Sequence, residues 1–301
     1  MRPTTDLFDL TGKVVIVTGS TKGIGRAMVE GLARAGASVV VSSRKQELCD
    51  RVAAEVAAAT GADVLPLACH MGDWDAVPGF VDEVHERFGR IDALVNNAGI
   101  NPARIGPADM TLEYWRKVFS VNLEGPLRAS QCVFPHMRDQ GGGSIVHIGT
   151  MGAYSGGANI CAYGASKAAL LNLTKSMAMA WAPANVRVNM LSPGPFMSEM
   201  MEGGAKTQPG FLDLVAGGTF MKRIADPDEI VGPVCYLVSD ASSFVTGDDL
   251  SVSGSSSGSS VLRAGNSSSQ SAAGSKCAST SMTVVSAFIS SSRRTPRGRR
   301  R

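Results

Sequence analysis

A tyrosine and a lysine stand four positions apart in the segment Tyr163-Gly164-Ala165-Ser166-Lys167. On a helix, residues i and i+4 lie on one face, so the phenol and the ammonium can reach one pocket. Tyrosine ordinarily ionises near pH 10, and a neighbouring ammonium favours the phenolate and lowers that pKa. The pair predicts proton transfer at an alcohol or carbonyl oxygen, with Tyr163 as acid/base beside a hydride transfer at nicotinamide. By itself the spacing also fits a packed tyrosine and an exposed lysine.

A second candidate site is the glycine-rich segment Thr18–Gly25, which follows an apolar run and precedes a helical pattern. Glycines let the backbone approach a pyrophosphate, and a helix N-terminus offers free N–H groups. An ordinary strand-to-helix turn is the alternative. Because the segment follows the first strand of an alternating pattern, we predict a dinucleotide site formed by Gly19, Ser20, Thr21, Lys22, Gly23, Ile24 and Gly25.

The end of the second predicted strand bears on the choice between NAD and NADP. An acid there would bond to ribose hydroxyls and favour NAD, but the segment reads Val41-Ser42-Ser43-Arg44-Lys45. Arg44 can pair with a 2′-phosphate, Ser43 can donate to it, and Lys22 adds positive charge. The sequence therefore favours NADP(H) over NAD(H). The alternative is that Arg44 and Lys45 only solvate the start of a helix.

Elements that position these residues alternate along residues 1–253. Val- and Ile-rich strands separated by helices predict a parallel sheet covered on both faces, and right-handed crossovers make it a doubly wound α/β fold. We expect strands at Lys13–Thr18, Ser38–Ser42, Val64–Ala68, Ile91–Val95, Ser144–Ile148 and Val186–Leu191. We expect helices at Ile24–Ala35, Gln46–Ala59, Trp74–Phe88, Leu112–Met137, Ala162–Trp181 and Asp228–Val238.

Further motifs follow in a fixed order: Asn96-Asn97-Ala98-Gly99 after the fourth strand, Asn122 in Ser120–Leu123, Pro193-Gly194 after the sixth strand, and Thr246-Gly247. Together with the glycine turn and Tyr163/Lys167, they resemble the short-chain dehydrogenase/reductase family over about residues 8–253. The likeness is to its NADP-dependent members of the 3-oxoacyl-(acyl carrier protein) reductase kind. The resemblance implies a three-layer Rossmann-type fold with seven strands in the order 3-2-1-4-5-6-7, and an oxidoreductase acting on a carbonyl or CH–OH group.

The resemblance also implies a role for each matching residue. Tyr163 is the acid/base, Lys167 lowers its pKa and holds the nicotinamide ribose, and Asn122 keeps a water in a proton relay to Lys167. For Asn122 the alternative is a helix-interior residue that bonds to backbone. No metal is expected. The remaining implied cofactor contacts are Asn97, Ala98 and Gly99, with Gly194 and Phe196 over the nicotinamide face.

Two positions depart from the family pattern. The family serine lies 13 residues before the tyrosine, where this chain has Thr150. Threonine keeps the hydroxyl, and its methyl group restricts χ1 and narrows the pocket, so we expect Thr150 in the serine role. His70 stands where many relatives carry an aspartate near the adenine. The competing hypothesis is a catalytically weak NADP-binding regulatory protein of the same fold.

Composition changes near residue 253. The segment 254–301 holds 16 serines, eight basic residues and no acid, so residues 1–253 carry 29 − 8 = 21 basic against 26 acidic residues. Such a segment buries too little apolar surface to order itself, which predicts one catalytic domain at 1–253 and a disordered tail at 254–301. Family character stops inside a motif at Ser251–Gly254, which suggests a translated frameshift or an unusual extension.

The same composition bears on partners and compartment. The mildly acidic body argues against nucleic acid as the main partner, although the basic tail keeps an anionic partner open. No run approaches the roughly 18 apolar residues of a membrane span, and the first 13 residues carry no apolar secretion signal. We expect a cytoplasmic enzyme for a small carbonyl or alcohol. We also expect a homodimer or homotetramer, weakened if the altered C-terminus disrupts the interface.

Overall fold

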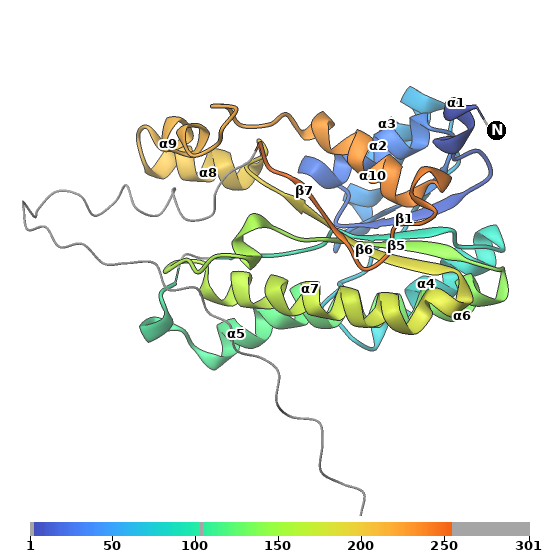
Figure 1. Ribbon diagram of the computed structural model, residues 1–301, viewed down its shortest axis with the longest axis horizontal. Helices are drawn as coiled ribbons and strands as arrows, with labels where there is room; N and C mark the ends of the chain where they lie inside the picture. Colours follow the sequence, from blue (N-terminus) through green and yellow to red (C-terminus); the bar gives the residue numbers. More distant parts are fainter. Residues whose placement is uncertain (1–2, 103–104, 255–301) are drawn as a thin grey trace, which may run out of the picture. The chain divides into compact units, whose positions relative to one another are not determined.

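A parallel sheet of seven strands lies at the centre of the computed structural model, which describes residues 3–102 and 105–254 (Figure 1). The strand order is β3-β2-β1-β4-β5-β6-β7, and every neighbouring pair is parallel. This confirms the predicted doubly wound fold and its order. The strands are β1 (Val14–Thr18), β2 (Ser38–Ser42), β3 (Val64–Pro66), β4 (Ala93–Asn96), β5 (Gly143–Ile148), β6 (Val186–Pro193) and β7 (Asp249–Val252).

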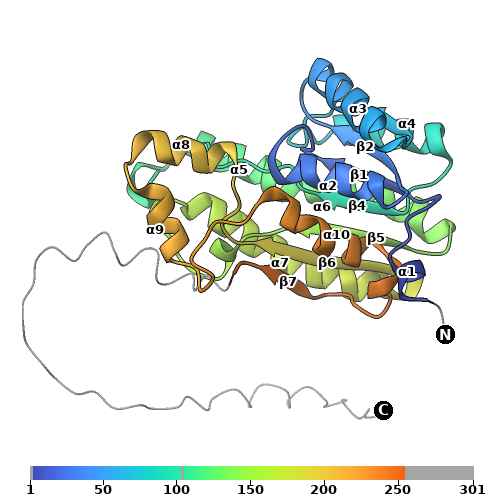
Figure 2. The ribbon, with the colours of Figure 1, turned by 90° about the horizontal axis from the view of Figure 1, so that it is seen from above.

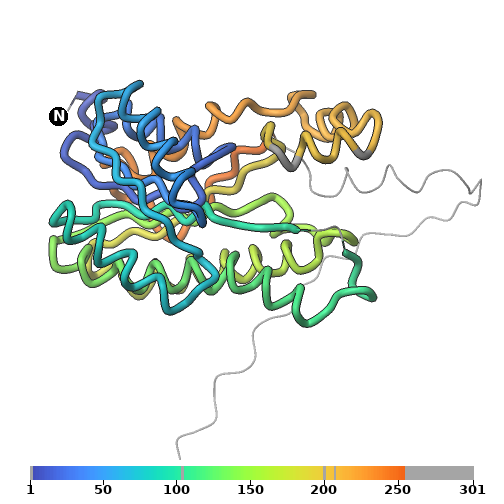
Figure 3. Tube along the Cα trace, turned by 180° about the vertical axis from the view of Figure 1, so that it is seen from behind, coloured from blue at the N-terminus to red at the C-terminus, as the bar shows by residue number. Residues whose placement is uncertain are grey.

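Helices cover both faces of the sheet and complete the three layers (Figures 1 and 3). One layer holds α2 (Gly23–Arg34), α3 (Gln46–Thr60) and α10 (Val231–Val238). The opposite layer holds α4 (Ala76–Phe88), α6 (Gly125–Asp139) and α7 (Cys161–Trp181). The other helices are α1 (Thr4–Leu7), α5 (Leu112–Phe119), α8 (Glu199–Thr207) and α9 (Phe211–Gly217).

In β1 and the other central strands, alternate residues pack in two separate cores. In β1, Val15 and Val17 pack with α2, α3 and α10, whereas Val14 and Ile16 pack with α4, α6 and α7. All five residues of β1 are buried. A strand buried on both faces needs apolar side chains at every position, which explains the continuous Val and Ile runs in the sequence.

The predicted helix Leu112–Met137 is wrong as a single regular helix. A π-helical segment, Ser120–Glu124, interrupts it and separates α5 from α6. The Asn122 side chain in this segment bonds to the backbone of Ile100, and a Cβ on Gly125 would lie 2.1 Å from the Met71 carbonyl oxygen. Tertiary contacts therefore accompany the local change in winding, and single π-turns of this kind often occur at functional sites.

The carboxyl ends of the strands form one edge of the sheet, and α8 and α9 lie beyond that edge (Figure 2). Thr18, Asn96, Ile148 and Pro193 each end a strand there. Loops that follow parallel strands therefore gather at this edge, where open α/β sheets bind ligands. The tail predicted at 254–301 falls, apart from Gly254, outside the described residues. Within the described part, no helix has the length and apolarity needed to span a membrane.

Candidate active site

The glycine turn between β1 and α2 is closely packed at two glycines and open at a third. Gly19 has φ +66°, and a Cβ there would lie 2.9 Å from the Ala98 Cα. A Cβ on Gly25 would lie 2.5 Å from both the Asn97 Nδ2 and the Gly19 carbonyl oxygen. Gly23 has φ +55° and no neighbour within 4 Å of a built Cβ. The turn thus presents free space at the N-terminus of a 12-residue helix, which fits the approach of a phosphate group.

Asn97 holds this turn in place. Its Nδ2 donates to the carbonyl oxygens of Thr18 and Gly19, both at 2.9 Å. In return, the Thr18 hydroxyl oxygen accepts from the backbone N–H groups of Asn97 at 3.1 Å and Ala98 at 3.0 Å. The Asn97 side chain therefore joins the end of β4 to the turn after β1.

The end of β2 lies beside the turn because Thr18 pairs with Ser42 in the sheet. Ser20 is fully buried, and its Oγ accepts from the Ser42 N–H at 3.0 Å, so Ser20 braces the turn from inside. Arg44 is exposed, and the Ser43 N–H donates to the Cys49 Sγ at 3.1 Å. The structure therefore brings Ser43 and Arg44 to the edge that carries the glycine turn, as predicted from the sequence.

Tyr163 and Lys167 lie in the first two turns of α7. Lys167 is 2% exposed, its Nζ donates to the Ile148 carbonyl oxygen at 2.8 Å, and burial lowers its pKa to about 8. Burial raises the pKa of Tyr163, and a hydrogen bond with the Thr150 side chain lowers it by less. Burial is the stronger influence here, so the net change in the Tyr163 pKa is upward, and the lowering of this pKa by Lys167 stays a prediction.

Thr150 follows β5 and caps a short 3₁₀ turn, Met151–Ala153. Its Oγ1 accepts from the Gly152 N–H at 3.2 Å, and the same side chain contacts the Tyr163 hydroxyl. Ile148, two residues earlier, supplies the carbonyl oxygen that accepts from Lys167. The end of β5 therefore meets the start of α7 at both members of the Tyr–Lys pair.

Asn122 is fully buried in the π-helical segment. Its Oδ1 accepts from the Ile100 N–H at 2.8 Å, and its Nδ2 donates to the Ile100 carbonyl oxygen at 2.9 Å and to the Ser166 Oγ at 3.2 Å. The alternative of a side chain bonded to backbone is therefore confirmed, and the water relay to Lys167 stays a prediction. The side chain bonds to backbone, and a Cβ built on Gly99 would lie 3.5 Å from the Asn122 Oδ1 and 3.6 Å from the Lys167 Nζ.

The remaining predicted residues lie around the same edge. Ala98 and Gly99 follow β4, and Gly99 is exposed between Asn122 and Lys167. The Gly194 N–H donates to the Val252 carbonyl oxygen at 2.9 Å, which ties the loop after β6 to β7. Phe196 is 4% exposed, and its side chain packs in the core on the α2 side. His70 is exposed after β3, and its Nδ1 accepts from the Gly72 N–H at 3.1 Å.

The chain is similar to known proteins in sequence and fold. The family model described as enoyl-(acyl carrier protein) reductase matches residues 19–255. The dehydrogenase/reductase SDR family member 4 of Caenorhabditis elegans is 37% identical over 249 residues, which are 81% of this chain and 94% of that protein. The chain belongs to the short-chain dehydrogenase/reductase family.

Two solved structures from the family have the same fold. A gluconate 5-dehydrogenase from Burkholderia cenocepacia, in complex with NADP and tartrate, matches with a TM-score of 0.80 and 33% identity over 84% of this chain and 98% of that one. An NADPH-dependent 3-quinuclidinone reductase from Rhodotorula rubra matches with a TM-score of 0.77 and 32% identity over 84% and 95%. Membership of the short-chain dehydrogenase/reductase family makes the chain an oxidoreductase of a nicotinamide-binding class.

Several contacts around the site were not predicted from the sequence. Thr18 bonds to the loop after β4, Cys49 contacts Ser43, and Tyr154 bonds to Asp249 on the edge strand. Thr18 is the first residue of the glycine motif, which is a signal that points to it. The contact between Tyr154 and Asp249 joins positions 95 residues apart and depends on strand order. No local pattern in the sequence reveals it.

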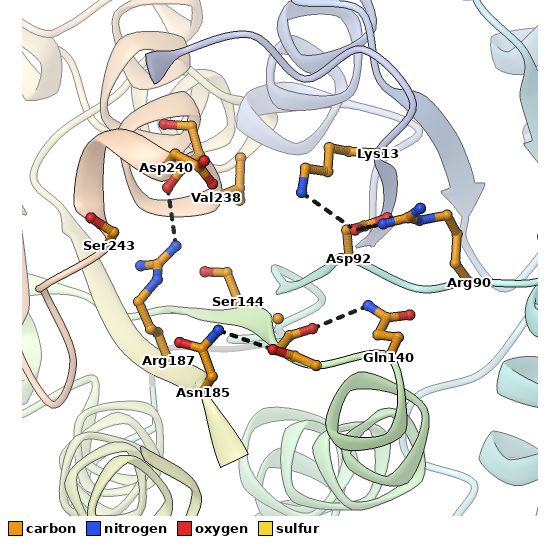
Figure 4. Close-up of a pocket in the computed structure, with 14 residues that line it drawn as sticks. Lys13, Arg90, Asp92, Gln140, Ser144, Asn185, Arg187, Val238, Asp240 and Ser243 are labelled. Atoms are coloured by element: carbon orange, nitrogen blue, oxygen red, sulfur yellow. Dashed lines mark hydrogen bonds and ion pairs between the residues drawn. The ribbon is translucent and has the colours of Figure 1, made fainter. Parts of the chain in front are cut away.

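A polar pocket of about 210 Å³ lies at the opposite edge, where strands begin (Figure 4). Asp92 accepts two hydrogen bonds from Arg90, at 2.8 and 2.7 Å, and lies 3.7 Å from the Lys13 Nζ. Arg187 donates to the Leu237 and Ser239 carbonyl oxygens and lies beside Asp240. The cations drawn in this pocket therefore already face anionic or carbonyl partners, and these contacts brace the starts of β1, β4 and β6.

Proposed function

We propose that this chain is an NADP-dependent oxidoreductase that interconverts a small carbonyl compound and its alcohol, with Tyr163 as the acid/base. The observation that carries the proposal is the meeting of the Tyr163 hydroxyl with Thr150, one helical turn from the buried Lys167. This set lies at the same sheet edge as the glycine turn and Gly99. A proton donor beside a dinucleotide site is what carbonyl reduction requires.

The residues at the end of β2 support NADP over NAD. The fit rests on Gly23, where a built Cβ finds open space, and on exposed Arg44 beside the turn. A guanidinium can pair with a 2′-phosphate through two parallel hydrogen bonds, and neither Ser43 nor its neighbours is an acid that would claim the ribose hydroxyls. Lys22 in the turn adds positive charge. Two solved relatives are described as NADP-bound or NADPH-dependent.

Side chains of this site divide the proton chemistry between them. When bound, the reduced dinucleotide supplies the hydride. Burial keeps the Tyr163 phenol protonated, so it can give its proton to the carbonyl oxygen as that oxygen becomes an alcohol. Thr150 can donate to the same oxygen and hold it beside the phenol. Lys167, with a pKa of about 8, can return a proton to the phenolate near neutral pH, and Asn122 would keep a water in that path.

Relatives also bear on assembly and substrate. Family members typically act on small molecules as oligomers, and we extend both properties to this chain as a homodimer or homotetramer. The exposed Phe220 and Met221 lie in the segment after β6 that would face the substrate. They favour a substrate with apolar character.

The test is turnover of a panel of ketones and aldehydes, followed at the nicotinamide absorbance. We expect the wild-type chain to oxidise NADPH and Tyr163→Phe to lose at least about 10³-fold in kcat, because the reaction loses its proton donor. NADPH affinity, measured by fluorescence titration, should change by less than about threefold, since the phenyl ring remains. Tyr114→Phe serves as a matched control outside the acid/base set.

Cofactor choice is measured in the same assay as the ratio of kcat/KM for NADPH to that for NADH. We expect a ratio well above one in the wild-type chain and a fall of about 10- to 100-fold in Arg44→Met, since a charged bidentate pair contributes roughly 1.5–3 kcal/mol. A wild-type preference for NADH would overturn the NADP assignment. Tight NADPH binding without turnover of any carbonyl would favour the regulatory alternative.

A further inference from the structure

Asp249, the first residue of the edge strand β7, joins three elements through one carboxylate. Its Oδ2 accepts a hydrogen bond from the Tyr154 hydroxyl and another from the Ser192 Oγ, the latter at 2.9 Å. Tyr154 follows the 3₁₀ turn that begins after Thr150, and Ser192 lies in β6, two residues before Gly194. The carboxylate therefore touches both segments that lead into the proposed active site.

The loop after β5 is attached to β7 at a second point. The Ser251 hydroxyl donates to the Met151 Sδ at 3.2 Å, which places Met151 and Tyr154 against alternate residues of the same strand. Thr150 stands immediately before these attached residues. Its own side chain caps the turn and contacts the Tyr163 hydroxyl. A shift of the loop relative to β7 would therefore move Thr150 relative to Tyr163.

The segment after β6 is fastened in the same way. Ser192 is fully buried. A Cβ built on Gly149, just after β5, would lie 2.4 Å from the Ser192 hydroxyl oxygen, so Ser192 fits only because residue 149 has no side chain. The Gly194 N–H then donates to the Val252 carbonyl oxygen. The strand β7 thus holds the loops after β5 and β6 in one relative arrangement, with Asp249 in contact with both.

Packing does not account for this arrangement. Tyr154 is 55% exposed, so its ring gains little by burial at this position. The second carboxylate oxygen of Asp249, Oδ1, is buried and has no hydrogen-bond partner within the described part of the chain. Burial of such an atom disfavours folding. The Tyr154 hydroxyl remains a proton donor to the carboxylate, because its partial removal from water, together with Asp249, raises the Tyr154 pKa to about 12.

We propose that Asp249 is a positioning residue, which holds the Thr150 loop and the Ser192–Gly194 segment in the arrangement that the reaction needs. The inference rests on the proposed role of Thr150 at the active site. It predicts a loss mainly in the chemical step rather than in NADPH binding, since the glycine turn follows β1, which lies four strands from β7 in the sheet. Displacement of a catalytic group by about 1 Å can cost up to roughly 100-fold in rate.

The test compares Asp249→Asn with Asp248→Asn, which removes the same charge from the adjacent, exposed residue. We expect kcat to fall about 10-fold in Asp249→Asn, with the NADPH dissociation constant within about twofold of wild type, because a charge-assisted hydrogen bond is roughly twice as strong as a neutral one. Asp248→Asn should match wild type. In Tyr154→Phe, kcat should fall by no more than in Asp249→Asn, since this change breaks the link to the Thr150 loop and leaves the link to Ser192. The losses in the double variant should be less than additive, since the two changes share the first link.

A second readout does not depend on turnover. Hydrogen exchange of the backbone amides at 152–154, which bond within the turn that begins at Thr150, should speed up in Asp249→Asn and Tyr154→Phe but not in Asp248→Asn. Unchanged exchange in these two variants, or equal effects of the Asp248 and Asp249 changes, would overturn the proposal. Additive losses in the double variant would overturn it as well. A wild-type chain without turnover would contradict the proposed function. The hydrogen-exchange measurement would then decide on the positioning role of Asp249 by itself.

Discussion

At the scale of single residues, burial of the Lys167 ammonium is the main cost in stability at the site. The Lys167 ammonium is 2% exposed and so gives up its hydration, and its hydrogen bond within the described residues goes to a carbonyl oxygen rather than to a carboxylate. The lowered pKa of about 8 records this cost. A lysine that shifts its pKa on burial can exchange protons near neutral pH, whereas an exposed lysine stays charged. Under the proposed function, this loss of stability accompanies a lysine that can exchange protons near neutral pH.

The cost predicts a specific dependence of stability on pH. Between pH 8 and 10.5 the unfolded chain binds the Lys167 proton and the folded chain does not, so stability rises with pH across this window and the penalty is complete below it. Lowering the Lys167 pKa from 10.5 to about 8 corresponds to a loss of about 3 kcal/mol in the free energy of unfolding below pH 8. Lys167→Met should therefore unfold with a higher free energy than wild type at pH 7, and the difference should shrink as the pH rises to 10.5. Urea unfolding at pH 7, 9 and 10 measures it, and a constant difference would contradict the expectation.

At the scale of elements, the glycine turn separates two requirements that its sequence does not distinguish. Gly25 is confined by the Asn97 amide and the Gly19 carbonyl oxygen, whereas Gly23 faces open space with a left-handed backbone. The first glycine position serves packing between the turn and β4. The second leaves room beside the N-terminus of α2, where an anion is favoured.

Alanine at these two positions should therefore have different consequences. Gly25→Ala should lower the free energy of unfolding by about 2–4 kcal/mol, because the methyl group meets backbone that cannot move away. Gly23→Ala should lower it by only about 1–2 kcal/mol, the strain of a positive φ, yet weaken NADPH binding more than 10-fold. Urea unfolding and fluorescence titration of both variants check the contrast. The expectation would be contradicted if both variants lost NADPH affinity in the same proportion to their loss of unfolding free energy.

Sequence reasoning reached the elements better than the contacts between them. Period and composition suffice to locate β1, β2 and α7 because each has a strong apolar pattern and a clear boundary. They do not reveal the π-helical segment, since its winding depends on contacts of Asn122 and Gly125 with distant loops. The net rise of the Tyr163 pKa cannot be predicted from the sequence for a similar reason. Burial of the phenol depends on the whole layer around it, whereas the nearby lysine is visible in the sequence.

At the scale of the whole molecule, the two edges of the sheet carry different chemistry. The carboxyl edge gathers polar groups with open space, such as Gly23 and exposed Arg44. The amino edge gathers ion pairs that are already closed, such as Arg90 with Asp92 (Figure 4). Arg44 at the carboxyl edge can therefore offer charge to a ligand, whereas Arg90 at the amino edge already pairs with Asp92.

We predict that the segment after Gly254 adds little to the stability of the fold. Within the described residues, both cores and the seven strands lie between residues 10 and 252. A chain that stops at Gly254 should keep its thermal unfolding midpoint within about 2 °C, since a loss of 1 kcal/mol would shift a domain of this size by roughly 2–4 °C. Differential scanning calorimetry of the full and shortened chains decides this, and a fall of more than about 5 °C would assign the tail a structural part.

The π-helical segment rotates the helix that follows it, α6, about the common axis relative to the helix before it, α5. One extra residue in a helical turn rotates everything beyond it by about 100°, the angle between successive residues of an α-helix. As a result α5 faces α7 while α6, on the same continuous stretch of chain, faces α4. Loss of a single residue between Ser120 and Glu124 would turn one of those two apolar faces toward solvent. At exposed Glu124, this short stretch should therefore tolerate a change of residue type far better than a change of length.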